Sequence, residues 1–109
     1  TSKIKSLDYK KQALQKEADN GKLILQNQLQ NAFQQYNQYL SQYNFYKSTA
    51  LPNAEIIVNT AKVGFKSGDI GYIEYLQALQ TATDVQLSYL QSVNQINQSI
   101  ININFLINK

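Results

Sequence analysis

Apolar residues recur along the chain at alternating steps of three and four, the spacing of one face of an α-helix. In the first part of the sequence this face consists of Ile4, Leu7, Leu14, Ala18 and Leu25, and Lys11 and Gly21 occupy its two remaining positions. The pattern resumes one residue out of phase at Leu29, Ala32, Tyr36, Tyr39, Tyr43, Tyr46 and Ala50. We interpret it as a coiled-coil seam, a line of positions facing a partner helix. One added step of four residues relaxes its supercoil.

Four tyrosines lie on one stretch of this seam: Tyr36, Tyr39, Tyr43 and Tyr46. Each carries a large apolar ring and a hydroxyl that needs a partner or water. Two interpretations stay open. The seam reaches a wet surface at this point, or it packs in the ordinary amphipathic way with the hydroxyls at its edge.

A single proline, Pro52, falls within the helical pattern. Inside a helix it removes one backbone hydrogen bond and clashes with the carbonyl four residues back, which is that of Ser48. The seam nevertheless continues in phase through Ala54, Ile57, Ala61 and Gly64. We therefore predict a kink rather than a loop, and one long first helix over residues 3–66.

Three of the four glycines lie close together near the middle of the chain. Gly68 suits the left-handed position that ends a helix. Asp69 or Gly71 can cap a following helix, and Glu74 places a carboxylate in its first turn, near the positive end of the dipole. The segment predicts a turn over residues 67–71.

Beyond the turn, residues 72–107 predict a second helix with two apolar ridges. The first ridge is a regular heptad seam: Tyr72, Tyr75, Leu79, Ala82, Gln86, Tyr89, Val93, Ile96, Ile100, Ile103 and Ile107. The second ridge is Ile73, Leu76, Leu87, Leu90 and Ile101. One hairpin partner cannot cover both ridges, so this helix is expected to lie between neighbours in a larger bundle or in the wall of a tube.

The two predicted helices differ in length, about 95 Å against about 50 Å at 1.5 Å per residue. If they pair about the turn, Ile107 lies roughly opposite residue 30, and residues 3–29 have no partner within the chain. The expected fold is therefore all-α, a long antiparallel helical hairpin (coiled coil) with unequal arms. Its missing partners would come from another copy or from a larger protein, and we expect the isolated chain to form homo-oligomers.

Composition supports a helical interaction protein rather than an enzyme. The 109 residues include only four glycines and one proline, and Gln and Asn make up about a quarter of them. Cys, His, Met and Trp are absent, which removes disulfides, thiol chemistry and the commonest zinc and copper ligands. The few acids have no histidine beside them to act as a general base, and phosphate-binding glycine motifs are missing. We therefore predict no catalytic site, no metal site and no cofactor.

Charge is unevenly distributed, since six of the ten lysines lie within the first 22 residues. These lysines are mixed with acids, as on the solvated face of a helix, and no positive stripe suited to nucleic acid follows the rest of the chain. The sequence begins Thr-Ser-Lys, with no signal peptide and no apolar run of membrane-spanning length. We expect it to be a single hairpin segment, residues 1–109, of something larger.

The span from residue 50 to residue 106 resembles the outer-membrane efflux channel family typified by TolC, in the second half of that family's repeat. The matching segments are Leu51-Pro52-Asn53-Ala54-Glu55, Ala61-Lys62-Val63-Gly64-Phe65-Lys66-Ser67-Gly68-Asp69-Ile70, Tyr75-Leu76-Gln77-Ala78 and Tyr89-Leu90. Their order and spacing agree with the family throughout. The single hairpin and the short turn also look similar to channel-like segments of heavy-metal cation pumps of the resistance-nodulation-division type.

The resemblance implies a passive periplasmic conduit in the envelope of a Gram-negative bacterium. Long helical hairpins of several protomers or repeats would line the tube, and its partners would be an adaptor (membrane-fusion) protein and an inner-membrane pump. The turn would meet the adaptor through Phe65, Ser67, Gly68, Asp69 and Ile70. The residues expected to pack helix on helix are Leu29, Tyr36, Tyr43, Ile57, Leu79, Tyr89, Val93 and Ile100.

Two other functions fit parts of the pattern. A cytoplasmic coiled-coil scaffold explains the heptads equally well, but it does not explain the ordered match around the turn. Binding of the lysine-bearing N-terminal helix to a membrane surface is the weaker of the two, because its lysines are mixed with acids.

Overall fold

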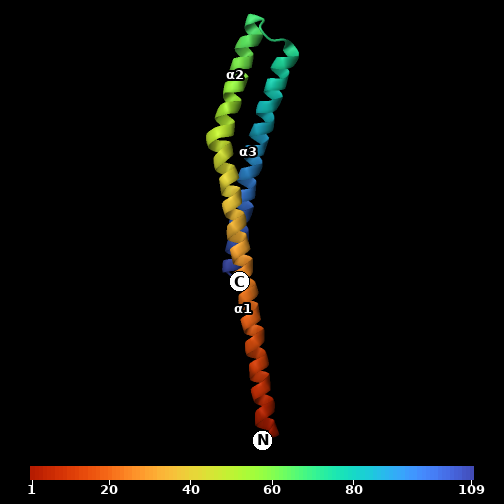
Figure 1. The fold of residues 1–109 in the computed structure, drawn as a ribbon, viewed down its shortest axis with the longest axis vertical. Helices are drawn as coiled ribbons and strands as arrows, with labels where there is room; N and C mark the ends of the chain where they lie inside the picture. The colour runs from red at the N-terminus through yellow and green to blue at the C-terminus, as the bar shows by residue number, and fades with distance from the viewer.

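The computed structural model describes all 109 residues, and its regular structure is entirely helical. The elements are α1 (Ser2–Phe45), the π-helical turn η1 (Tyr46–Ala50), α2 (Leu51–Ser67) and α3 (Tyr72–Ile107). The first three form one continuous rod, and α3 runs back beside it from the turn (Figure 1). The molecule measures 97 × 21 × 15 Å. The predicted all-α antiparallel hairpin with unequal arms is confirmed.

The short arm ends beside the middle of α1. Ile103 and Leu106 of α3 form a buried cluster with Ala32, and Leu25, Leu29 and Tyr36 pack against this cluster. The predicted level of the last turn of α3, near residue 30, is therefore confirmed. Every residue from 1 to 24 is exposed, and this part of α1, the α1 extension, continues alone beyond the C-terminus (Figure 1).

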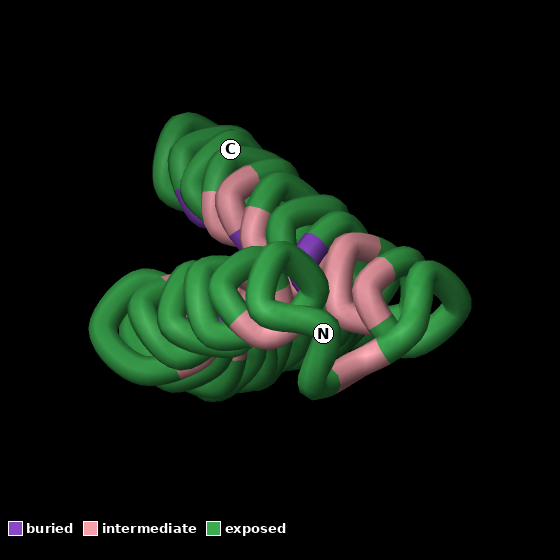
Figure 2. Tube along the Cα trace, turned by 90° about the horizontal axis from the view of Figure 1, so that it is seen from above, coloured by how far each residue is buried: buried purple, intermediate pink, exposed green.

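The core is a thin strip between the two arms. Only seven residues are buried, namely Ala32, Ala54, Ala82, Ser92, Ser99, Ile103 and Leu106. Seen from the end of the rod, the buried positions lie where the arms face each other (Figure 2). A strip this thin leaves most apolar side chains in contact with solvent, so the hairpin by itself covers only one face of each helix.

The packed face of α3 keeps most of the predicted seam and extends to one side of it. Tyr75, Ala82, Tyr89, Ile96 and Ile103 face the other arm, as the heptad predicts, and Leu79 and Val93 are half-buried. The packed face also includes Ala78, Val85, Ser92, Ser99 and Leu106, on the other side of this line. Tyr72, Gln86, Ile100 and Ile107 of the predicted seam are exposed. Small Ala and Ser side chains let the helix axes approach closely.

The chain stays helical through Pro52, and the local distortion precedes the proline. At η1 the Leu51 N–H donates to the carbonyl of Tyr46, five residues back, so the turn is one residue wider than an α-helical turn. Beyond it, Ala54 is buried and Ala61 and Gly64 are half-buried, as the predicted seam requires. Val58 is half-buried against α3, whereas Ile57, predicted to lie on the seam, is 44% exposed.

The second apolar ridge of α3 is uncovered, as predicted. Its members Ile73, Leu76, Leu87, Leu90 and Ile101 are all exposed. Burying a large aliphatic side chain is worth about 1.5–3 kcal/mol, so an open ridge of this length favours a further partner.

Candidate interaction site at the hairpin turn

The turn is closed by hydrogen bonds that converge on one carbonyl. Gly68 ends α2 in the left-handed conformation, with φ 84°. The Gly64 carbonyl accepts the N–H groups of Asp69 (2.8 Å) and Ile70 (3.2 Å) and the Ser67 hydroxyl (3.1 Å). These bonds satisfy groups that a helix end leaves unpaired, as a glycine-terminated helix requires. The backbone of the turn is therefore fixed by its own residues.

Two side chains of the turn are held against it rather than projecting freely. Ile70 packs over Gly64, where an added Cβ would meet the isoleucine side chain at 3.4 Å, close to ordinary van der Waals contact. The Asp69 carboxylate accepts the Ser67 hydroxyl at 3.0 Å. Asp69 and Gly68 nevertheless remain exposed and available to another molecule.

An aromatic group joins the two arms just below the turn. Phe65 stacks on Tyr75 of α3, with ring centroids 5.1 Å apart and ring planes at 9°, and it also meets Tyr72 at 6.0 Å. Such pairs contribute about 0.5–1.5 kcal/mol beyond the area that they bury. Phe65, expected to touch an adaptor, therefore also holds α2 to α3.

A shallow hollow of about 540 Å³ lies beside the turn on α2. Its lining is mainly apolar: Ile56, Ile57, Thr60, Ala61, Val63, Gly64, Asp69 and Ile70. Ile56 and Val63 are exposed and were not among the predicted site residues. Their spacing of seven was present in the sequence, but the prediction followed only the seam. The hollow adds an apolar surface to a turn that otherwise offers polar groups.

The predicted turn residues lie close together in the structure, whereas the predicted seam residues lie at intervals along the two arms. Phe65, Ser67, Gly68, Asp69 and Ile70 all lie within the last turn of α2 and the connection. The helix–helix residues extend along most of the paired region. Leu29, Tyr36, Tyr43, Leu79, Tyr89 and Val93 are half-buried, whereas Ile57 and Ile100 are 44% and 41% exposed.

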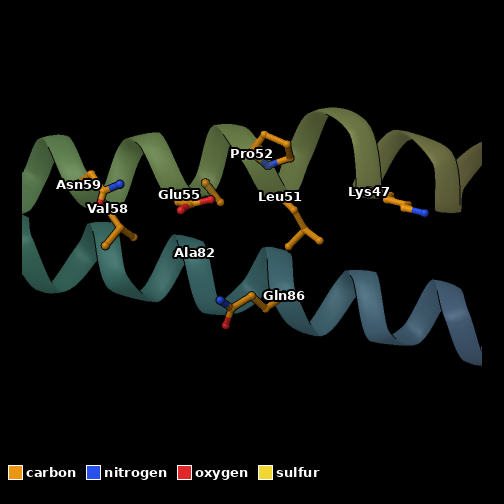
Figure 3. A pocket seen from close by; sticks show the side chains of 9 residues that line it. Lys47, Leu51, Pro52, Glu55, Val58, Asn59, Ala82 and Gln86 are labelled. Carbon is orange, nitrogen blue, oxygen red and sulfur yellow. The ribbon is translucent and has the colours of Figure 1, made fainter.

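A longer open groove of about 510 Å³ runs between α2 and α3 beside η1 (Figure 3). Leu51 and Val58 point across it toward α3, and Pro52 points away (Figure 3). Lys47 and Glu55 from the first arm and Gln86 from α3 also line it. The groove exists because Ala82 opposite Ala54 fills little space.

Farther down the paired region, Tyr43 of α1 and Tyr89 of α3 stack with ring centroids 5.7 Å apart. A hydrogen bond with the Tyr43 hydroxyl raises the pKa of Tyr89 above its ordinary value, and partial loss of water adds to this effect. Tyr36, Tyr39, Tyr43 and Tyr46 are each half-buried.

No three acidic side chains lie close enough together to hold a metal ion. None of the helices is both long enough and apolar enough to cross a membrane. What the turn offers is a rigid, exposed backbone with one carboxylate, next to an apolar hollow.

The chain is similar to the cobalt-zinc-cadmium resistance protein CzcC of Cupriavidus metallidurans, with 32% identity over 63 residues. The match covers 58% of this chain but only 15% of CzcC. The chain therefore corresponds to a small part of that protein's length. No protein-family model matches the chain, and no solved structure matches it.

Proposed function

We propose that this chain is the periplasmic helical hairpin of a TolC-like outer-membrane efflux channel in a system that exports heavy-metal cations. The similarity to a cobalt-zinc-cadmium resistance protein carries the proposal. Two further observations support it: the ordered match of the sequence around the turn to the efflux channel family, and the 97 Å hairpin. In this role the chain is a structural part of a passive conduit and performs no reaction.

In the proposed arrangement the turn is the docking point for a periplasmic adaptor. The self-bonded backbone around Gly64 presents Gly68 and Asp69 without a conformational cost on binding. The hollow next to it accepts an apolar side chain of the adaptor on Ile56 and Val63. The exposed ridge of α3 packs against a neighbouring hairpin of the tube, and the inner-membrane pump delivers the cations.

The test compares two aspartates in the full-length channel, in cells that lack their own copy. Asp69 at the turn and Asp84 in the middle of α3 are both exposed, and each accepts one side-chain hydrogen bond. We expect Asp69→Lys to lower resistance to zinc, cobalt and cadmium, and to lower cross-linking to the adaptor, by about 10-fold, the effect of losing one well-placed charged contact. Asp84→Lys should leave both unchanged.

The rival function is a coiled-coil scaffold without a transport role, which the uncovered ridge of α3 favours. A scaffold would tolerate Asp69→Lys as well as Asp84→Lys. Cells that keep full metal resistance and adaptor cross-linking with Asp69→Lys would refute docking at the turn. A deletion of the whole protein that leaves metal resistance unchanged would refute the efflux function itself.

A further inference from the structure

Amide side chains cover one face of the hairpin where α1 and α3 pair. Two shallow hollows of about 270 Å³ each lie on this face. Because Gln35 and Asn102 line both hollows, the two form one continuous surface. We call it the amide face and define it by six of its side chains: Gln28, Asn31 and Gln35 of α1, and Gln95, Gln98 and Asn102 of α3.

The hairpin carries no charged side chain at the level of the amide face. Neither residues 23–46 of the first arm nor residues 85–107 of α3 include Asp, Glu, Lys or Arg. Charges return directly outside this stretch, at Lys22, Lys47 and Asp84. The uncharged stretch is about 34 Å long at 1.5 Å per residue. Surfaces open to bulk water ordinarily mix charges of both signs, as the rest of this chain does. Solubility alone therefore does not explain a long surface of amides without charges.

The opposite face of the hairpin at this level is apolar. Phe33 lies two residues from Gln35, a spacing that puts it on the other side of α1. Leu90 lies five residues from Gln95, on the other side of α3. Phe33 and Leu90 are 47% and 60% exposed, and Leu90 belongs to the ridge that would pack against a neighbouring hairpin. Once that side is covered, the amide face is the one that stays in contact with water.

We propose that the amide face lines the lumen of the tube and makes this stretch of the conduit electrically neutral. This inference rests on the proposed function and states how the wall treats the exported cation. In a symmetric assembly every side chain recurs around the axis, so one carboxylate would become a ring of carboxylates. Such a ring concentrates divalent cations, and a ring of lysines repels them.

Amides avoid both effects. Their carbonyl oxygens accept hydrogen bonds and their NH₂ groups donate them, so they bind the water around a hydrated cation without adding a charge to the wall. A cation therefore crosses this stretch with its water shell, and the wall offers neither a binding site nor an electrostatic barrier. Selection among metals then belongs to other parts of the export system.

Charges placed on the two sides of α1 at one level test which side borders the lumen. Gln35 lies on the amide face, and Asn37 is exposed on the opposite side of the helix. In the full-length channel, reconstituted in a planar lipid bilayer, Gln35→Glu should raise the permeability ratio of potassium to chloride by roughly 10-fold. Gln35→Lys should lower the ratio by a similar factor, whereas a structural disturbance would move it in one direction for both variants. Asn37→Glu and Asn37→Lys are the matched controls and should leave the ratio unchanged.

Zinc gives a second readout, because a ring of carboxylates holds divalent cations. Zinc chloride should reduce the current through Gln35→Glu and Gln98→Glu channels at concentrations that leave the unmodified channel and Asn37→Glu open. Gln35→Cys covers the case in which a charge at this position prevents assembly, since this chain has no cysteine of its own. A negatively charged thiol reagent added to the open Gln35→Cys channel should shift the permeability ratio as Gln35→Glu does, and it should have no effect on Asn37→Cys.

Three outcomes would contradict the inference in different ways. A selectivity that responds to Asn37 and not to Gln35 would put the opposite side of α1 in the lumen and overturn it. A selectivity indifferent to both positions would also overturn it, while the conducting channel would leave the efflux function intact. A full-length protein that opens no ion-conducting pore would refute the efflux channel and this inference with it.

Discussion

The paired hairpin, residues 25–107, and the α1 extension share one sequence pattern but differ in their surroundings. Both carry apolar residues at steps of three and four. In the hairpin these residues pack against the other arm, whereas in the extension every one of them faces solvent. The pattern thus indicates that each helix has a face suited to packing against another helix. Whether that face is covered depends on how the rest of the chain is arranged. The two regions therefore act as controls for each other.

The largest expected contrast is in amide hydrogen exchange. At a concentration where the chain is monomeric, amides of residues 3–22 should exchange at least about 100-fold faster than those of the buried cluster around Ala32, because local opening of an unpaired helix disturbs no packing. Mass spectrometry of peptides resolves the two regions. Equal protection in dilute solution would contradict the picture of a single, unpaired helix.

Repeating the exchange measurement at a higher protein concentration tests how the chain self-associates. Protection that then spreads through the extension would follow from its pairing with a second copy. Protection that grows only along the ridge of α3 would point to side-by-side assembly instead.

The next contrast compares two isoleucine truncations. Ile103→Ala removes a buried side chain from the cluster with Ala32 and Leu106, and we expect it to lower the free energy of unfolding by about 2–3 kcal/mol. Ile4→Ala in the extension makes the same chemical change at an exposed position and should cost less than about 0.5 kcal/mol. Urea denaturation followed by circular dichroism measures both. Equal effects would mean that the hairpin and the extension are not distinct in stability.

Two glycines should respond to alanine with opposite signs. Gly68 has φ 84°, so Gly68→Ala strains the turn and should destabilise the hairpin by about 1–2 kcal/mol. Gly21 lies inside the extension with nothing near its missing Cβ, so Gly21→Ala should raise helicity, with a gain of about 1 kcal/mol in helix propensity. The helicity and the melting temperature of the monomer measure whether each substitution stabilises or destabilises the protein. A stabilising Gly68→Ala would show that the left-handed turn is not maintained in solution.

The smallest effect is a titration at alkaline pH. The raised pKa of Tyr89 means that its neutral form is favoured by folding. The corresponding stability is complete below the unfolded value of about 10 and is lost as the pH rises through the folded value. Tyr43→Phe keeps the stacked ring but removes the hydroxyl, so Tyr89 should ionise at lower pH. Ultraviolet absorbance detects this shift, and Tyr9→Phe in the extension should leave the remaining titration unchanged.

Features that depend on residues close together in the sequence were predictable from the sequence. The glycine cluster located the turn, the helical spacing gave two arms, and their lengths placed the end of α3 near residue 30. The uncovered ridge of Leu87 and Leu90 followed from counting apolar positions against one available partner. None of these steps required knowledge of how closely the two helices approach.

The predictions that were wrong depend on how closely the two helices approach each other. Positions on both sides of the line from Tyr75 to Ile103 repeat every seven residues. Ser92 and Ser99 on one side are buried, whereas Ile100 on the other side is 41% exposed, and this choice depends on the interhelical distance, which no local pattern encodes. Likewise, Val58 rather than Ile57 occupies the packed position between Ala54 and Ala61. The apolar hollow beside the turn was missed for the same reason, since Ile56 lies off the predicted seam.

The convergence of hydrogen-bond donors on the Gly64 carbonyl has a consequence for how the hairpin forms. These hydrogen bonds join residues only a few positions apart in the sequence. With increasing distance from the turn, the contacts between the two arms join residues that are farther apart in the sequence. Each new contact therefore adds only a small entropy cost of loop closure. We expect folding to begin at the turn and to proceed along the arms from there. The cluster of Ala32 with Leu106 closes last, so it should open first when the protein is pulled or heated.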